Sequence, residues 1–155
     1  MDVLLDSPQD FENLCLLSRT FEVLGVRRCY VHDPNRLVRP RYGKSRTRQI
    51  KAISAGAFFR VAFERVEEPD ELLAALPGRK VATVPDQSAT PLPRFAFRPD
   101  DVIVFGSEGR GIRPEVLALC DERVTVPQRG VTGSLNLAVS SGIVLFEFFR
   151  QAPTS

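Results

Sequence analysis

The chain has 155 residues, of which 43% are hydrophobic, 26% charged and 8% aromatic, with a formal net charge of +2. These values exclude low-complexity disorder, collagen and coiled coil, and no apolar run approaches the roughly 20 residues of a membrane-spanning helix. The start of the chain, MDVLLDSPQD, lacks the basic and apolar regions of a signal peptide. The cysteines Cys15, Cys29 and Cys120 are far apart and form no CxxC pair, which predicts reduced thiols. We expect one soluble cytoplasmic domain over residues 1–155, without a membrane partner.

The first half of the chain predicts three strands and two helices. Val3 to Leu5 and Cys29 to His32 are short apolar runs, and Phe59 to Glu64 alternates apolar and polar residues as a strand does. Helical spacing from about Gln9 ends at Gly25, and a second helix is expected from Ser45 to Ala55. His32, at the end of a strand, lacks partners at a spacing typical of a catalytic triad.

A basic segment lies between Asp33 and Glu64. It contains no acidic residue and eight cations, so it carries +8 while the rest of the chain carries 13 − 19 = −6. Such segregation favours a site for a polyanion such as RNA; the alternative is a solvated loop and helix face. The eight residues are Arg36, Arg39, Arg41, Lys44, Arg46, Arg48, Lys51 and Arg60.

The second half continues the alternation. Helices are expected from Pro69 to Pro77-Gly78, from Pro114 to Leu119 and from Ser134 to Phe149, and strands at Val81 to Val84, Val102 to Phe105 and Val124 to Val126. Pro85 to Pro99, with four prolines, is expected to be irregular. Strands alternating with helices predict an α/β fold with a mostly parallel sheet.

The last predicted helix is apolar around its whole circumference. A helix covering a sheet needs only one apolar stripe, so apolar residues on all sides predict cover on all sides. A second copy of the chain is the expected cover, which predicts a homodimer through this helix. The apolar residues are Leu135, Leu137, Val139, Ile143, Val144, Leu145, Phe146, Phe148 and Phe149.

Five of the ten glycines lie between Gly106 and Gly133, in FGSEGRGI and PQRGVTGSLN. Each segment follows a predicted strand, and ligands of parallel sheets bind where strands end. Glycine lets the backbone approach a ligand closely, so a pocket is favoured over two simple turns. The spacing differs from G-x-G-x-x-G, which argues against a dinucleotide site. No metal is expected.

These residues resemble a known family. VIVFGSEGRGI and VTVPQRGVTGSLNLAVSSGIVLFEFFRQ are similar to the second and third motifs of the SpoU (TrmH-like) branch of the SPOUT RNA methyltransferases. The first motif of that family is an Asn followed six positions later by an Arg, matched here by Asn13 and Arg19. The resemblance spans nearly the whole chain, with no added RNA-binding domain. Cys15 stands where the family usually has glycine, and we expect its side chain to crowd the RNA or the neighbouring loop.

The resemblance implies a Rossmann-like parallel sheet with helices on both faces, a C-terminal trefoil knot and a dimer. It also implies S-adenosylmethionine, bound in a bent form by the knot loops, as donor of a methyl group to a ribose 2′-hydroxyl of RNA. The compact length favours tRNA, with rRNA next. The alternative is a catalytically silent RNA-binding dimer of the same fold.

Residue roles follow from the resemblance. Arg19 is expected to hold a phosphate and stabilise the developing alkoxide, with Glu108, water or Arg19 itself as the general base. Asn13 is expected to orient Arg19 or the loops. Ser134 is expected to cap the final helix and fix the cofactor loop, and Asn136 to anchor the knot backbone or a ribose; for these two residues a catalytic role stays open beside the structural one. The expected cofactor contacts are Thr83, Val84, Gly106, Ser107, Glu108, Gly109, Gly111, Ile112, Val126, Pro127, Gly130, Ser134 and Leu135. The expected RNA contacts are Arg39, Arg41, Lys44, Arg46, Arg48, Arg110 and Arg129.

Overall fold

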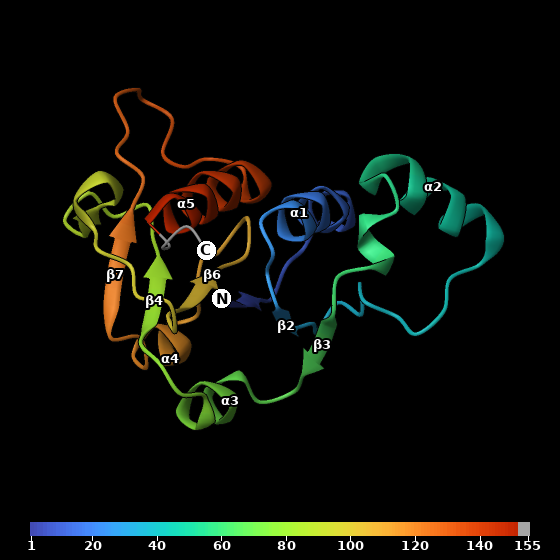
Figure 1. Cartoon of the computed structure of the whole chain (residues 1–155), viewed down its shortest axis with the longest axis horizontal. Helices are drawn as coiled ribbons and strands as arrows, with labels where there is room; N and C mark the ends of the chain where they lie inside the picture. The colour runs from blue at the N-terminus through green and yellow to red at the C-terminus, as the bar shows by residue number, and fades with distance from the viewer. Residues whose placement is uncertain (152–155) are drawn as a thin grey trace.

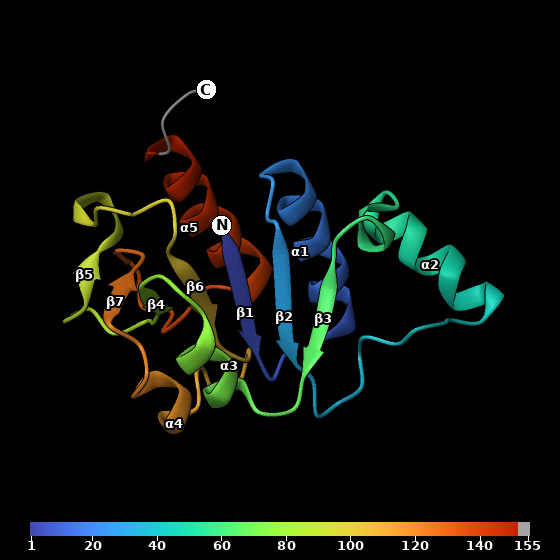
Figure 2. The same cartoon turned by 60° about the horizontal axis from the view of Figure 1, so that its bottom comes forward.

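The computed structural model describes residues 1–151 and shows a seven-stranded sheet with helices on both faces (Figures 1 and 2). Every strand pair is parallel, and the strand order is β3-β2-β1-β6-β4-β7-β5. The strands are β1 (Asp2–Asp6), β2 (Arg28–His32), β3 (Phe63–Val66), β4 (Lys80–Thr83), β5 (Thr90–Pro91), β6 (Val102–Phe105) and β7 (Glu122–Thr125). The predicted α/β class with a parallel sheet is therefore confirmed.

Five α-helices and two short 3₁₀ helices connect the described strands. The α-helices are α1 (Phe11–Val23), α2 (Lys44–Ser54), α3 (Pro69–Ala75), α4 (Pro114–Leu117) and α5 (Leu137–Gln151), and the 3₁₀ helices are η1 (Ala57–Phe59) and η2 (Leu92–Arg94). Asp10 caps α1, because its carboxylate accepts hydrogen bonds from the N–H groups of Glu12 and Asn13. Gly25 follows the end of α1 with φ +68°, as its predicted stop role requires.

The sheet separates two hydrophobic cores. Helices α1, α2 and α5 lie on one face, and α3 and α4 lie on the other (Figure 1). Along β1 the side chains alternate between the faces: Val3 and Leu5 pack in the core that includes α1 and α5, and Leu4 packs with Leu73 and Val116. Both faces of the central strands are thus covered, which explains their uninterrupted apolar sequences.

Three predicted elements differ from the structure. The strand expected from Phe59 to Glu64 is β3 at Phe63–Val66, and Phe59 ends the helix η1. The segment before β3 is not extended, because the ring of Phe58 packs against Phe11 and Phe63 and holds η1 in place. The segment expected to be irregular, Pro85 to Pro99, contains β5 and η2.

The third difference is the start of the last helix, which lies at Leu137 and not at Ser134. In residues 1–151, no helix combines the length and apolar character needed to cross a membrane.

Candidate functional site: a pocket at the carboxyl ends of β4, β6 and β7

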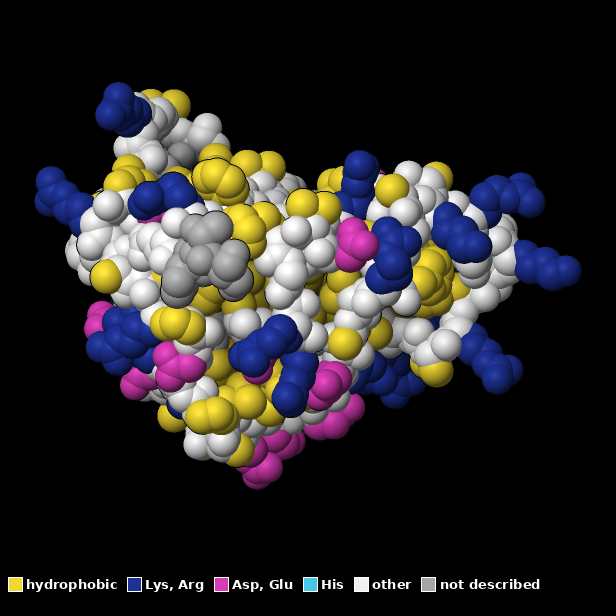
Figure 3. All heavy atoms as spheres, in the orientation of Figure 1, with side chains coloured by type: hydrophobic (Ala, Val, Ile, Leu, Met, Phe, Trp, Pro, Cys, Tyr) yellow, Lys and Arg dark blue, Asp and Glu magenta, His cyan; other side chains and the backbone are white. Residues whose placement is uncertain are grey.

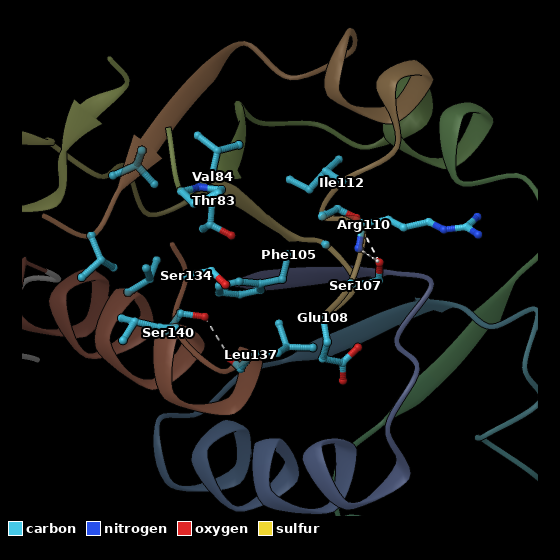
Figure 4. A pocket seen from close by; sticks show the side chains of 18 of the residues that line it. Thr83, Val84, Phe105, Ser107, Glu108, Arg110, Ile112, Ser134, Leu137 and Ser140 are labelled. Atoms are coloured by element: carbon cyan, nitrogen blue, oxygen red, sulfur yellow. Dashed lines mark hydrogen bonds between the residues drawn. The ribbon is translucent and has the colours of Figure 1, made fainter. Parts of the chain in front are cut away.

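A pocket of about 420 Å³ lies where three neighbouring strands end (Figure 4). The two glycine-rich segments and the start of α5 meet there, although they are far apart in the sequence. Its lining residues are Thr83, Val84, Pro85, Phe105, Gly106, Ser107, Glu108, Gly109, Arg110, Gly111, Ile112, Leu117, Val124, Val126, Gln128, Ser134, Leu135, Leu137, Ser140 and Val144. The volume falls in the range of about 300–1,000 Å³ that is typical of small-molecule sites.

The first glycine segment forms a tight bend after β6. Ser107 and Gly111 exchange two backbone hydrogen bonds of 3.0 Å, and Gly111 has φ +68°. Gly106 lies directly against the returning chain, since a Cβ there would be 2.1 Å from the carbonyl carbon of Gly111 and 2.2 Å from the nitrogen of Ile112. Only glycine fits at this position, so the bend requires it.

A chain of hydrogen bonds joins this bend to two helices. The Asn13 amide donates to Glu108 Oε1 over 3.0 Å, and the Asn136 amide donates to Asn13 Oδ1 over 2.9 Å. Glu108 also accepts the backbone N–H groups of Gln9 and Asp10, at 2.9 and 3.3 Å. The structure therefore brings three of the predicted catalytic residues into one network, which fixes the bend and the amino ends of α1 and α5.

Asn136, and not Ser134, caps the last helix. Asn136 Oδ1 accepts the N–H groups of Ala138 at 2.8 Å and Val139 at 3.4 Å, which corrects the prediction for Ser134. Both residue types cap helices well, but Asn136 directly precedes the first helical residue, Leu137, whereas Ser134 lies two residues further from the helix. Ser134 lines the pocket instead.

The far end of the glycine bend is held by a buried carboxylate. Asp6 is fully buried at the end of β1 and accepts the backbone N–H and the Nε–H of Arg113, at 2.8 and 2.9 Å. Ser7 and His32 approach the same carboxylate, but His32 uses one ring nitrogen, Nδ1, for both neighbours. His32 thus ends β2 and contacts residues at the end of β1, in line with the interpretation of it as a strand-end residue.

Of the predicted cofactor contacts, eleven line the pocket; Pro127 and Gly130 are not among its lining residues. Arg110 borders the pocket, but its guanidinium extends away from it (Figure 4). Arg19 is exposed on α1 and is not part of the lining. The remaining predicted RNA contacts are all exposed: Arg39, Arg41, Lys44, Arg46, Arg48 and Arg129.

Sequence reasoning missed the pocket residues on the inner side of α5. Leu137, Ser140 and Val144 line the pocket at spacings of three and four residues. That spacing places them on one side of a helix, so the helical period could have identified them. Phe105 and Gln128 were missed because the strand and the loop were analysed for their glycines alone.

Cys15 lies on the inner side of α1. It is fully buried in the core beneath α2, and burial raises the pKa of its thiol to about 11. Direct crowding of RNA by this side chain is therefore wrong, because the side chain is buried. The other expected effect, a change in how α1 approaches the neighbouring loop, stays a prediction.

Removing the amide of Asn13 tests the hydrogen-bond chain. Asn13 is only 7% exposed, so Asn13→Ala leaves the amide of Asn136 and one oxygen of Glu108 without this partner. We expect the free energy of unfolding, measured by urea denaturation, to fall by about 1–3 kcal/mol. The exposed Ser45→Ala is the control; an equal change in both variants contradicts the role of the hydrogen-bond chain.

Comparisons with known proteins agree with this arrangement. The sequence profile of the SpoU rRNA Methylase family matches residues 1–146. A 23S rRNA (guanosine-2'-O-)-methyltransferase of Acinetobacter baylyi is 31% identical over 151 residues, which are 95% of this chain and 58% of that relative. A tRNA (guanosine(18)-2'-O)-methyltransferase of Aquifex aeolicus is 27% identical over 152 residues, or 96% of this chain and 68% of the relative. The chain thus spans about three fifths to two thirds of these relatives.

Solved structures show the same fold. A structure described for the 2-OH methylation of C/U34 on tRNA has a TM-score of 0.78 at 28% identity, and the match covers 97% of this chain and 94% of that one. The SpoU methyltransferase AviRb from Streptomyces viridochromogenes, in complex with AdoMet, has a TM-score of 0.78 at 26% identity, with 97% and 60% covered. The family profile, the shared fold and the three motif residues joined at one pocket together establish that this chain belongs to the SpoU methylase family.

Proposed function

We propose that this chain transfers a methyl group from S-adenosylmethionine to a ribose 2′-hydroxyl of RNA, with tRNA as the first candidate and rRNA as the second. The observation that carries the proposal is the meeting of the glycine bend, the second glycine segment and the start of α5 around one pocket of about 420 Å³. Relatives of both substrate classes support it. The match to nearly the whole length of the C/U34 enzyme favours tRNA.

The pocket suits S-adenosylmethionine in size and chemistry. Apolar side chains such as Val84, Ile112 and Leu137 offer flat contact surface for an adenine ring, and the bend from Gly106 offers backbone N–H and carbonyl groups. The cofactor is a cation at sulfur, and Glu108 is the carboxylate among the lining residues. When bound, the cofactor supplies an activated methyl group. We assign its contacts to the predicted residues, including Pro127 and Gly130 on the neighbouring loop.

The hydrogen bonds of Glu108 favour a positioning role. Its carboxylate accepts N–H donors from Gln9, Asp10 and Asn13, so we assign it to holding α1 against the bend and leave the proton of the hydroxyl to solvent. A guanidinium group donates several hydrogen bonds in a fixed geometry and suits a phosphate as partner. In this proposal Arg19 binds the phosphate beside the reacting ribose and stabilises the developing negative charge.

A homodimer completes the proposal. Val139, Ile143, Phe146 and Phe149 form an exposed apolar stripe on α5, beside a groove of about 620 Å³ that includes Leu92 and Pro93. Helix α1 lies next to α5 (Figure 1). Leu16 and Val23 are exposed on α1, and we propose that they extend the same surface. An apolar surface of this kind favours a symmetric contact between two copies.

The proposed dimer also indicates at which pocket Arg19 acts. Positions 16, 19 and 23 share one side of α1, so Arg19 lies within the surface that the second copy covers and outside the pocket of its own chain. We therefore propose that Arg19 serves the pocket of the partner subunit. The cytoplasm is the proposed location, which the free thiols of Cys15, Cys29 and Cys120 support.

The function is tested by titrating S-adenosylmethionine into the protein in a calorimeter and by assaying methyl transfer to bulk tRNA and rRNA. We expect cofactor binding and a 2′-O-methyl product in tRNA, identified by nucleoside mass spectrometry. Cofactor binding without transfer to any RNA would favour the silent RNA-binding dimer. Failure to bind the cofactor contradicts the assignment of the pocket.

Arg19→Ala is expected to abolish methyl transfer and to leave cofactor affinity nearly unchanged, because Arg19 does not line the pocket. A matched variant, Ser140→Phe, fills the pocket from α5 and is expected to abolish both. Mixing the two inactive variants after subunit exchange then tests the partner role. One site of each mixed dimer has an intact pocket and an intact Arg19 from the partner, so about a quarter of wild-type activity should return. No recovery despite confirmed exchange contradicts the partner role.

Phe146→Glu is expected to convert the dimer into monomers, because Phe146 is 58% exposed at the centre of the α5 stripe and a charge cannot be buried there without a partner. Analytical ultracentrifugation should show the mass fall from twice the chain mass to the mass of one chain. Val131→Glu, at an exposed valine outside α5, is the control. A wild-type protein that is already monomeric contradicts the proposed dimer.

A further inference from the structure

Three cations project from the outer side of α2, and we name Lys44, Arg48 and Lys51 the cationic ridge. All three are exposed. Their spacing of four and three residues places them on one side of the helix, over a length of about 10 Å. The buried residues Ile50 and Ser54 lie on a different side and hold α2 against the protein.

The charge of the ridge is not neutralised within residues 1–151. Of the eight cations in the basic segment, Arg60 forms an ion pair, with Glu22 at 2.9 Å, and no ion pair within the described residues involves the other seven. Helix α2 contains no acidic residue, and Lys44 lies in its first turn, where the helix dipole disfavours a cation. Lys44 and Arg48, four residues apart, also repel each other. An anionic partner would relieve these unfavourable charge interactions.

The ridge is held in a fixed orientation. The guanidinium carbon of Arg46 lies 4.0 Å from the ring centre of Phe11, and its Nη1 donates to Gln49. Tyr42 packs between Phe11 and Phe58, with ring centres 5.8 Å apart in each pair. Arg46 therefore acts as a tether between α2 and α1, and we exclude it from the ridge, although its sequence position predicted a phosphate contact.

The ridge and the pocket lie on opposite sides of α1. Figures 1 and 2 both show α5, α1 and α2 in that order, and Figure 3 shows Lys and Arg side chains gathered at the α2 end of the molecule. A nucleotide that enters the pocket of this chain is therefore not the one that contacts this ridge. The partner of the ridge must extend well beyond the reacting ribose.

Helix α2 carries the charge of the ridge without an aromatic side chain of its own, and the exposed Phe59 lies beyond the end of α2, on η1. Tyr42 is the single aromatic residue between positions 34 and 54, its ring packs against Phe11 and Phe58, and its hydroxyl donates to the Leu37 carbonyl. Proteins that bind single strands stack bases on aromatic rings, whereas a duplex presents a dense, regular line of phosphates. Exposed cations on a helix that carries no aromatic side chain match the second kind of surface.

We propose that the cationic ridge binds the sugar-phosphate backbone of a double-stranded RNA stem that flanks the nucleotide to be methylated. This inference rests on the proposed function, because it specifies the substrate of the same enzyme. It assigns the ridge to affinity for structured RNA and leaves the transfer step to the pocket.

The experiment measures binding of the full-length protein to an RNA hairpin, and to an oligouridine of the same length that forms no duplex, between about 50 and 200 mM salt. In the triple variant Lys44→Gln, Arg48→Gln, Lys51→Gln, we expect weaker hairpin binding and a log–log salt slope reduced by about 3, one for each lost phosphate contact. Cofactor affinity should not change. The wild type should bind the hairpin more tightly than the oligouridine.

The control removes the same charge elsewhere. Arg94, Arg98 and Arg123 are exposed on η2, on the loop before β6 and on β7, all outside α2, and their triple Gln variant should keep the wild-type salt slope. An unchanged slope in the ridge variant, an equal loss in the control, or equal affinity for both RNAs overturns the proposal. A protein that binds the hairpin through the ridge but transfers no methyl group refutes the proposed function and leaves the ridge inference intact.

Discussion

The site depends on one line of hydrogen bonds, from Glu108 through Asn13 to Asn136. These residues come from the β6 bend, from α1 and from the position before α5, and they are separated by 95 and 123 residues along the chain. Each amide in the line also belongs to a helix end, because Asn13 lies within the first turn of α1 and Asn136 caps α5. A change at any point therefore moves a helix end and the pocket wall together.

The bend itself is held at both ends by carboxylates of different kinds. Glu108 is partly exposed and binds the amino end of α1, whereas Asp6 is fully buried and binds Arg113. Gly106 lets the bend close on itself at a distance that no side chain permits. Because both carboxylates act on backbone and side-chain donors together, the loop is shaped before any ligand binds, which lowers the entropy cost of binding.

The sequence correctly predicted the elements whose bounds depend on neighbouring residues alone. The apolar run Val102 to Phe105 is β6 without a change of boundary, and Gly25 ends α1. Phe59 was misassigned because the alternation around it is shared by a strand and by an aromatic cluster, and only tertiary packing on Phe58 distinguishes them. The position of β6 between β1 and β4 was not predictable, because parallel strands pair across long connections that carry no local pairing signal. The same holds for the site. The motif identified Asn13, Glu108 and Asn136, but which of two good capping residues caps α5 depends on where the helix begins, and that is fixed by tertiary contacts such as the hydrogen bond from Asn136 to Asn13.

The apolar residues around α5 have three different surroundings: the pocket, the core and the surface. One side, with Leu137, Ser140 and Val144, lines the pocket, and Leu145 and Phe148 pack in the core. The remaining side, with Val139, Ile143 and Phe146, is exposed in the single chain. Val139 also donates its N–H to the Asn136 cap, so the first turn of α5 belongs to the hydrogen-bonded network and to the exposed stripe at once. A second copy that covers this stripe would restrain the same turn that forms the pocket wall. Assembly and cofactor binding would then stabilise one structural element, and each would favour the other.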